Sequence, residues 1–223
     1  MEPRVVDFEA GLAMRAVVIG GHSRNIGKTS VMAKLIRRVR PPEWAAVKIT
    51  HFGHGVCSLD GEPCSCDPGE HGFVLTEERE RNGRSDTRRF LQAGARRSLW
   101  LRVRQGQLHR AVPALLRALR REEWVMIESN SILGHIDPAL YLFVLDPSRS
   151  DFKASARKYL EKADALVTIG SSLFNHPWPD IDAGLLSNKP GFHLAHPDET
   201  SDDLIRFVRQ KLNLDGAALS SPN

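Results

Sequence analysis

Short runs of apolar residues alternate along the chain with segments whose apolar residues recur every three or four positions. The short runs predict strands at residues 15–20, 44–50, 98–103, 124–128, 141–146, 165–170 and 191–195. The helical spacing predicts helices at residues 29–39, 86–93, 108–120, 152–162 and 199–212. Because strands alternate with helices, we expect an α/β fold of three layers, a mostly parallel sheet with helices on both faces.

The remaining segments bound this domain, which we expect to span residues 15–214. Residues 1–14 are a polar leader that we expect to be flexible, and residues 215–223 read as a disordered tail. Residues 51–80 lack periodicity and are rich in Gly, Cys, His and Pro, which predicts a long loop. With 41% hydrophobic and 26% charged residues in 223, the rest has the composition of a globular protein.

The sequence also indicates the cellular compartment in which we expect the protein. No run of about 18 apolar residues predicts a membrane span, and the leader lacks a basic segment followed by an apolar one. Three cysteines crowded between Cys57 and Cys66 do not make a disulfide framework, so we expect a cytoplasmic protein.

The net charge of +4 comes largely from arginines in residues 79–97 and 102–121. Such arginines form a solvated outer face in one interpretation and meet an anionic partner, such as a nucleotide or a pterin phosphate, in the other. Nucleic acid is a minor option because no recognition motif accompanies the charge.

A glycine-rich segment, GGHSRNIGKTS, lies between the first predicted strand and the first predicted helix. Its end is the G-K-[ST] half of the Walker A pattern, in which backbone amides and a lysine hold phosphates and a hydroxyl binds Mg²⁺. The first glycine of the strict pattern falls on His22, so a plain glycine turn before an ordinary helix remains an alternative. The expected nucleotide-binding residues are Gly21, His22, Ser23, Arg24, Asn25, Ile26, Gly27, Lys28, Thr29, Ser30 and, at the end of the second strand, Lys48.

A triphosphate site of this kind needs carboxylates for its metal. Glu128 ends the apolar strand WVMIE, and Asp86 opens the helix after the long loop. We expect Thr29, Asp86 and Glu128 to serve Mg²⁺, and Lys28, Asp86 and Glu128 to be the catalytic residues; each acid is a surface group or a cap in the alternative reading.

The long loop concentrates soft ligands. Cys57, Cys64 and Cys66 with His51 or His54 offer enough sulfur and nitrogen atoms for Zn²⁺, or less readily for an iron–sulfur cluster. The spacing is not a C-x-x-C pair, so a flexible lid with free thiols is the alternative. Asp146, Arg149 and His176 follow predicted strands, at the rim where open α/β sheets bind ligands.

Four segments give the chain a family resemblance: HSRNIGKTS, KITHFGH, SDTRRFLQAGA and the strand that ends in Glu128. Together they resemble the molybdopterin-guanine dinucleotide biosynthesis protein B (MobB) family of P-loop NTPases. The resemblance implies GTP binding, slow hydrolysis, a homodimer, and assistance to the guanylyltransferase that attaches GMP to the pterin cofactor. It also implies that Lys48 and His51 face the nucleotide or the pterin.

Three classes of function therefore stay open. The first is a GTPase-like hydrolase of the MobB kind. The second is an ATP-dependent ligase or small-molecule kinase, since the loop is also similar to those of dethiobiotin synthetase relatives. The third is a non-catalytic binding module that responds to nucleotide or metal.

Overall fold

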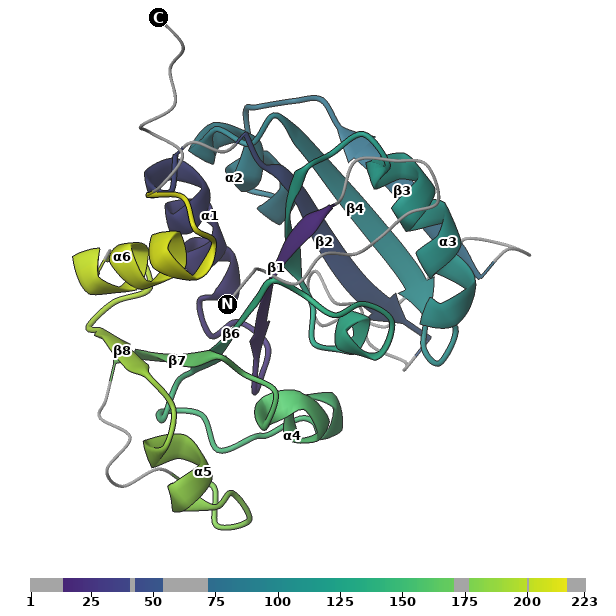
Figure 1. Cartoon of the computed structure of the whole chain (residues 1–223). Coiled ribbons are helices and arrows are strands. Elements are labelled where there is room, and N and C mark those ends of the chain that lie inside the picture. Colours follow the sequence, from purple (N-terminus) through teal and green to yellow (C-terminus); the bar gives the residue numbers. More distant parts are fainter. Residues whose placement is uncertain (1–13, 41–42, 54–71, 171–176, 200, 216–223) are drawn as a thin grey trace, which may run out of the picture.

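An eight-stranded sheet forms the centre of the molecule (Figure 1). The computed structural model describes residues 14–40, 43–53, 72–170, 177–199 and 201–215. The strand order is β3-β4-β2-β5-β1-β6-β7-β8, and every neighbouring pair is parallel except β3 and β4. The strands are β1 Arg15–Gly21, β2 Ala45–Phe52, β3 Phe73–Glu78, β4 Arg97–Arg104, β5 Trp124–Glu128, β6 Leu140–Leu145, β7 Ala165–Ile169 and β8 Gly191–Leu194.

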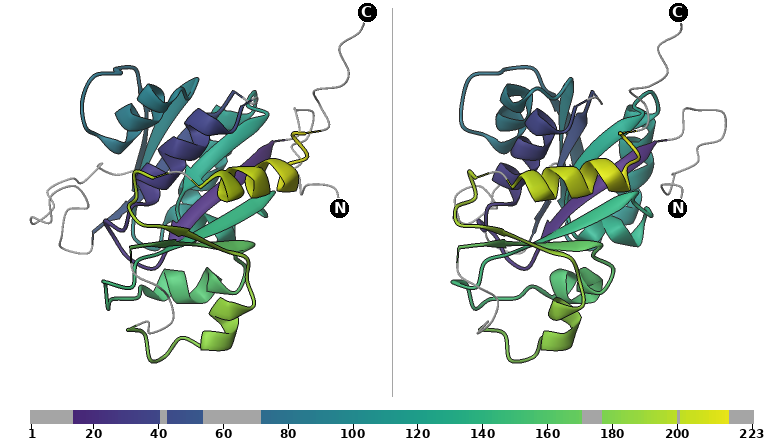
Figure 2. Two further views of the ribbon diagram at one scale, coloured as in Figure 1. Left: turned by 90° about the vertical axis from the view of Figure 1, so that its left-hand side faces the viewer. Right: turned by 60° about the vertical axis from the view of Figure 1, so that its left-hand side comes forward.

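Helices cover both faces of this sheet. The helices are α1 Lys28–Arg38, α2 Asp86–Ala93, α3 Leu108–Leu119, α4 Ala154–Leu160, α5 Ala183–Ser187 and α6 Asp202–Lys211, with a 3₁₀ turn, η2, at Ser131–Gly134. Apolar residues of α1, α2 and α6 pack on one face, and those of α3, η2, α4 and α5 pack on the other. Figure 2 shows α6 lying across the sheet beside α1.

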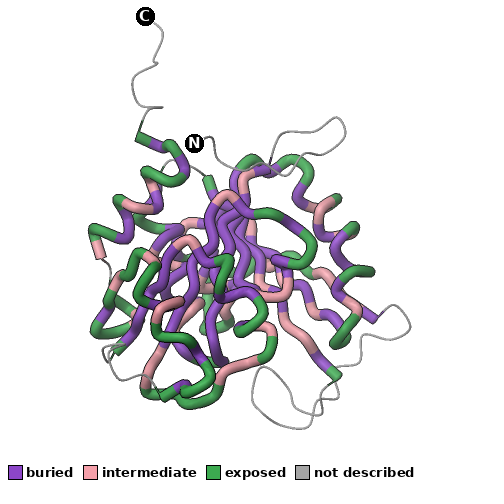
Figure 3. Tube along the Cα trace, turned by 60° about the horizontal axis from the view of Figure 1, so that its bottom comes forward, coloured by how far each residue is buried: buried purple, intermediate pink, exposed green. Residues whose placement is uncertain are grey.

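The central strand β1 divides the core. Its residues alternate between the faces, so Ala16 and Val18 join the cluster under α3, whereas Val17 and Ile19 join the cluster under α1. All four side chains are fully buried, as are most residues of the neighbouring strands (Figure 3). Burial on both faces explains why the parallel strands read as continuous apolar runs. Met14, which we assigned to the flexible leader, is also part of the core.

These features confirm the expected fold class, an α/β fold of three layers with a mostly parallel sheet and helices on both faces. The helix at 86–93 has the expected ends: the Ser85 side chain accepts a hydrogen bond from the Arg88 amide, and Gly94 takes the left-handed conformation with φ 104°. Pro113 lies inside α3 without ending it.

The structure corrects the prediction of one long loop at 51–80. Residues 73–78 form β3, an antiparallel edge strand against β4, and β2 continues to Phe52. Lys48 therefore lies within β2 and not at its end. The strand β3, FVLTEE, is only partly buried and has just three consecutive apolar residues before polar and acidic ones, which is why its pattern is weak.

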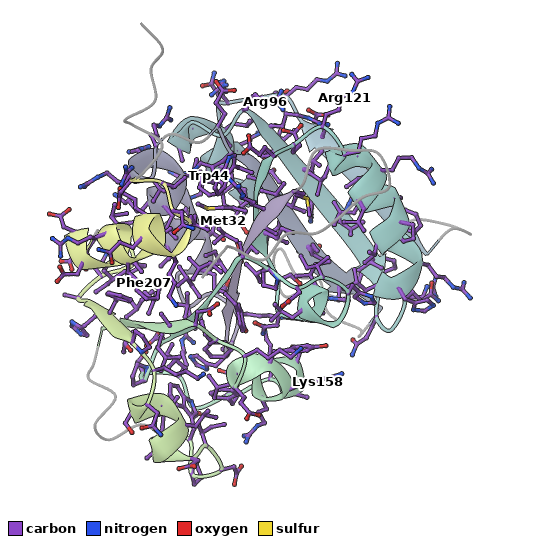
Figure 4. The ribbon with its side chains drawn as sticks, viewed as in Figure 1. Met32, Trp44, Arg96, Arg121, Lys158 and Phe207 are labelled. Carbon is purple, nitrogen blue, oxygen red and sulfur yellow. The ribbon has the colours of Figure 1, made fainter. Side chains whose placement is uncertain are left out.

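Arginines of the stretch 79–97 pair with carboxylates of the chain itself. The pairs include Arg88 with Glu78, Arg96 with Glu122, and Arg97 with both Glu77 and Glu122. Glu122 is buried, whereas Arg96 and Arg121 lie at the outer edge of the molecule (Figure 4). For these arginines, pairing within the chain favours the interpretation as a charged outer face over that as a site for an anionic partner. Among the described residues, no helix is both long and apolar enough to cross a membrane.

Candidate functional site

The loop between β1 and α1 opens onto the first turn of α1. Gly27 has φ 88° and lies at the N-cap, where no side chain caps the helix and no acidic residue occupies the first turn. A side chain at Gly27 would also meet Ile169 Cδ1 at 2.6 Å and the Pro197 Cβ at 2.7 Å. The uncapped amides at the start of α1 suit an anion.

The two departures from a glycine-rich loop have structural explanations. Asn25 has φ 55°, a left-handed conformation that asparagine tolerates better than most residues. His22 is not among the described residues with positive φ, so its position does not require glycine.

Asn130 fixes the end of β1. Its Oδ1 accepts a hydrogen bond from the Gly21 amide at 2.9 Å, and its Nδ2 donates to the Gly21 carbonyl at 2.9 Å. The amide of Gly21 is thus already paired with a protein acceptor. The one signal of Asn130 in the sequence is its place two residues after the end of β5, where ligand and loop contacts of α/β sheets gather.

His22 is fully buried, and its ring packs against two other aromatic rings in a tilted arrangement. The centroid of its ring lies 4.6 Å from that of Trp178 and 5.3 Å from that of Phe152. Its backbone amide donates to the Val144 carbonyl at 3.3 Å. The imidazole is therefore held among buried aromatic side chains of the protein itself.

Lys28, the first residue of α1, turns back over the loop. Its Nζ donates a hydrogen bond to the Ser23 carbonyl at 2.5 Å. Burial lowers the pKa of Lys28 to about 8, against the opposing effect of the Glu128 carboxylate. A buried ammonium group whose charge is this weakly supported has much to gain from a bound anion.

Three oxygen-bearing side chains and one lysine meet next to α1. Thr29 Oγ1 donates to Glu128 Oε2 at 2.7 Å, and Lys48 Nζ lies 2.5 Å from Glu128 Oε1 and 2.9 Å from Asp86 Oδ2. Lys48 and Glu128 are register partners on the adjacent strands β2 and β5. Burial alone would lower the pKa of Lys48. The carboxylates of Glu128 and Asp86 have the larger combined effect, so the pKa of Lys48 is raised.

This arrangement brings the three predicted Mg²⁺ ligands together. The Lys48 ammonium also lies 3.5 Å from Thr29 Oγ1, so one cationic atom touches a hydroxyl and two carboxylates. An all-oxygen set of this kind fits the preference of Mg²⁺. The position of the Lys48 ammonium shows where these oxygen atoms together stabilise a positive charge.

Other predicted loop residues have diverse surroundings. Ile26 is buried in the core beneath α1, whereas the side chain of Arg24 is exposed. Ser23 is buried and bonds Asp151, and Ser30 Oγ accepts a hydrogen bond from Arg89 Nη2 at 2.7 Å. The sequence analysis did not single out Asp151 or Arg89.

The predicted Cys and His site is only partly described. Cys57, Cys64, Cys66 and His54 lie outside the described residues, as does His176. His51 lies in β2, where its Nε2 is 2.8 Å from Ser131 Oγ. Within the described ranges, no three His, Cys, Asp or Glu residues cluster in a way that would hold a metal ion.

Trp178 is part of the packing around His22. It is buried, and its Nε1 donates to the Arg149 carbonyl at 2.8 Å while its ring packs on His22. These contacts show that Trp178 packs between loops of the chain.

Comparisons with known proteins give only distant similarities. No protein-family model matches the sequence, and no curated protein matches it. Among solved structures, HypB from Helicobacter pylori in complex with nickel has a TM-score of 0.46 at 14% identity, covering 92% of this chain and 91% of that one. HypB from Archaeoglobus fulgidus, a hydrogenase maturation factor, has a TM-score of 0.48 at 13% identity, covering 90% and 91%.

LpxK from Aquifex aeolicus, in complex with ATP, has a TM-score of 0.46 at 14% identity. It matches 81% of this chain, which spans only 53% of the LpxK chain. The fold assignment of this chain rests on its own strand order and on the β1–loop–α1 unit.

Proposed function

We propose that the chain binds a Mg²⁺–nucleoside triphosphate, with GTP as the favoured nucleotide, at the loop between β1 and α1, and hydrolyses it slowly. The observation that carries this proposal is the convergence of Lys28, Thr29 and Glu128 at the uncapped start of α1. Backbone amides of residues 25–30 and the Lys28 ammonium would hold phosphate oxygens.

Thr29, Asp86 and Glu128 would hold the metal ion, which supplies positive charge to the phosphate oxygens when it is bound. The Lys48 ammonium already bonds Glu128 and Asp86. In the proposed complex Lys48 turns from these carboxylates toward a phosphate oxygen, because the metal takes over their neutralisation. Glu128 is the candidate to orient the attacking water.

The preference for GTP and a role in molybdopterin guanine dinucleotide synthesis, as a homodimer beside the guanylyltransferase, come from the resemblance to MobB. Asn25 departs from the family pattern, which often has glycine at this position, and its left-handed conformation is one that asparagine tolerates. A possible Zn²⁺ or iron–sulfur site in the Cys and His loop remains a separate proposal, which metal analysis of the purified protein tests.

Titration calorimetry with GTP, ATP, GDP and ADP, with and without Mg²⁺, tests the proposal. We expect a Mg²⁺-dependent affinity for triphosphate, tighter for GTP, and slow release of phosphate. Transfer of the terminal phosphate to an added acceptor would favour the ligase or kinase class instead, and tight binding without turnover would favour the binding module. Absence of triphosphate binding would overturn the proposal.

A further inference from the structure

The segment between β6 and α4, residues 146–153, is fastened to the loop that precedes α1. The Asp146 amide donates to His22 Nε2 at 3.1 Å, and His22 Nδ1 lies 2.8 Å from the Asp151 carbonyl. The carbonyl of His22 accepts a hydrogen bond from the Lys153 amide at 2.9 Å. His22 thus connects the loop before α1 with the segment 146–153. It occupies the position where the strict phosphate-loop pattern has glycine.

These hydrogen bonds fix the chemical form of His22. A carbonyl oxygen only accepts, so Nδ1 carries the proton, and Nε2 accepts from the Asp146 amide. The neutral ring packs against Trp178 and Phe152, which hold it in place. The segment therefore has a defined position relative to the phosphate-binding loop.

The segment places Lys153 beside this loop, since the Lys153 amide bonds the His22 carbonyl. Burial and the positive charges of Lys28 and Arg24 lower the pKa of Lys153 to about 7. Within the described part of the chain, Lys153 forms no ion pair with a carboxylate, and Asp151, its nearest acidic influence, already bonds Ser23. Cations gathered without enough acids repel one another, and a bound polyanion removes that repulsion.

We propose that Lys153 is a specificity-determining residue that contacts the terminal phosphate of the nucleoside triphosphate, and that His22 is the positioning residue that holds its loop there. Lys28 lies at the start of α1, while Lys153 approaches from the segment after β6, so the two ammonium groups reach the anion from different elements. A second cation at the terminal phosphate would favour triphosphate over diphosphate and would stabilise charge during its transfer. This inference rests on the proposed function.

Calorimetric affinities of Lys153→Met for GTP and GDP with Mg²⁺ test the inference. We expect the affinity for GTP to fall by roughly tenfold or more and that for GDP to change by less than about twofold, because only the triphosphate has the contacted group. Lys158→Met removes an exposed lysine from α4 (Figure 4) and should change neither affinity. Lys153→Arg should restore most of the GTP affinity.

The outcomes separate the two proposals. If the wild type binds no triphosphate, the proposed function fails. If the wild type binds GTP and Lys153→Met keeps the same ratio of GTP to GDP affinity, the role of Lys153 is wrong while the site stands. Should Lys153→Met fail to fold by circular dichroism, Lys153→Gln replaces it, and the same unchanged ratio would overturn the inference.

Discussion

Thr29 donates a hydrogen bond to Glu128 across 2.7 Å, joining the start of α1 to the end of β5. Glu128 is only 3% exposed, and its second oxygen bonds Lys48 from the neighbouring strand. The bond therefore aligns a hydroxyl, a carboxylate and an ammonium group at the edge of the sheet where the strands β1 and β5 end. In the proposed complex, the same two residues flank the metal ion.

Glu128→Gln keeps the size of this side chain and removes its charge. We expect the affinity for Mg²⁺–triphosphate to fall by about 10- to 100-fold, because a carboxylate of the metal site is lost. Binding in the absence of Mg²⁺ should change little. Calorimetry at several Mg²⁺ concentrations measures both effects, and Glu123→Gln, an exposed acid next to β5, serves for comparison. Equal losses with and without Mg²⁺ would contradict a role at the metal.

The affinity for triphosphate should fall as the pH rises from about 7 to about 9. The pKa of Lys153 is about 7 and that of Lys28 about 8 in the free protein, and a bound phosphate raises both, so binding takes up protons over this range. Affinities measured across this range for wild type and Lys153→Met test the assignment. The variant should have a shallower dependence, with the remaining slope due to Lys28; an unchanged slope would show that Lys153 takes up no proton.

His22 should make the folded protein sensitive to mild acid. Burial lowers the pKa of His22 below its ordinary 6.5, so protonation favours the unfolded chain. Its contribution is complete above about pH 6.5 and is lost as the pH falls through the range between the unfolded and the folded pKa. His22→Asn keeps a donor near Nδ1 and does not titrate, so its urea unfolding free energy should depend less on pH below 6.5. If the unfolding free energy of His22→Asn depends on pH as steeply as that of the wild type, His22 is not the source of the acid sensitivity.

Asn130→Ala should destabilise the protein by about 1 to 3 kcal/mol, because both backbone groups of Gly21 lose their partner in a part-buried position. Chemical unfolding measures the change in free energy. Asn188→Ala, at the exposed end of α5, should cost much less. Equal costs would mean that water replaces the Asn130 side chain without loss.

The parallel strands and the position of the loop between β1 and α1 were predictable because their signals are local. Buried strands such as β5 are continuous apolar runs, and the residues from Gly27 to Ser30 follow one another in the chain. Glu128 was predictable for the same reason, since it ends such a run. The strand order of the folded sheet then brings it to Thr29.

The rest depends on contacts between distant residues. Lys153 and Asp151 lie more than 120 positions from His22, and no periodicity marks them; their only signal is a place in the loop after a strand end. The edge strand β3 is half exposed, so tertiary pairing with β4, not its own pattern, determines its structure. The sequence does not reveal the aromatic neighbours of His22, which are distant from it in the chain.

The most direct test of the central claim is calorimetric titration of Mg²⁺–GTP and Mg²⁺–ATP into wild type, Lys28→Ala and Arg37→Ala. Arg37 lies exposed on the same helix, α1, away from its first turn. The account predicts that wild type and Arg37→Ala bind a triphosphate equally, whereas Lys28→Ala loses at least about tenfold in affinity, because the buried phosphate charge loses its ammonium partner. Equal affinity of Lys28→Ala and wild type would contradict it.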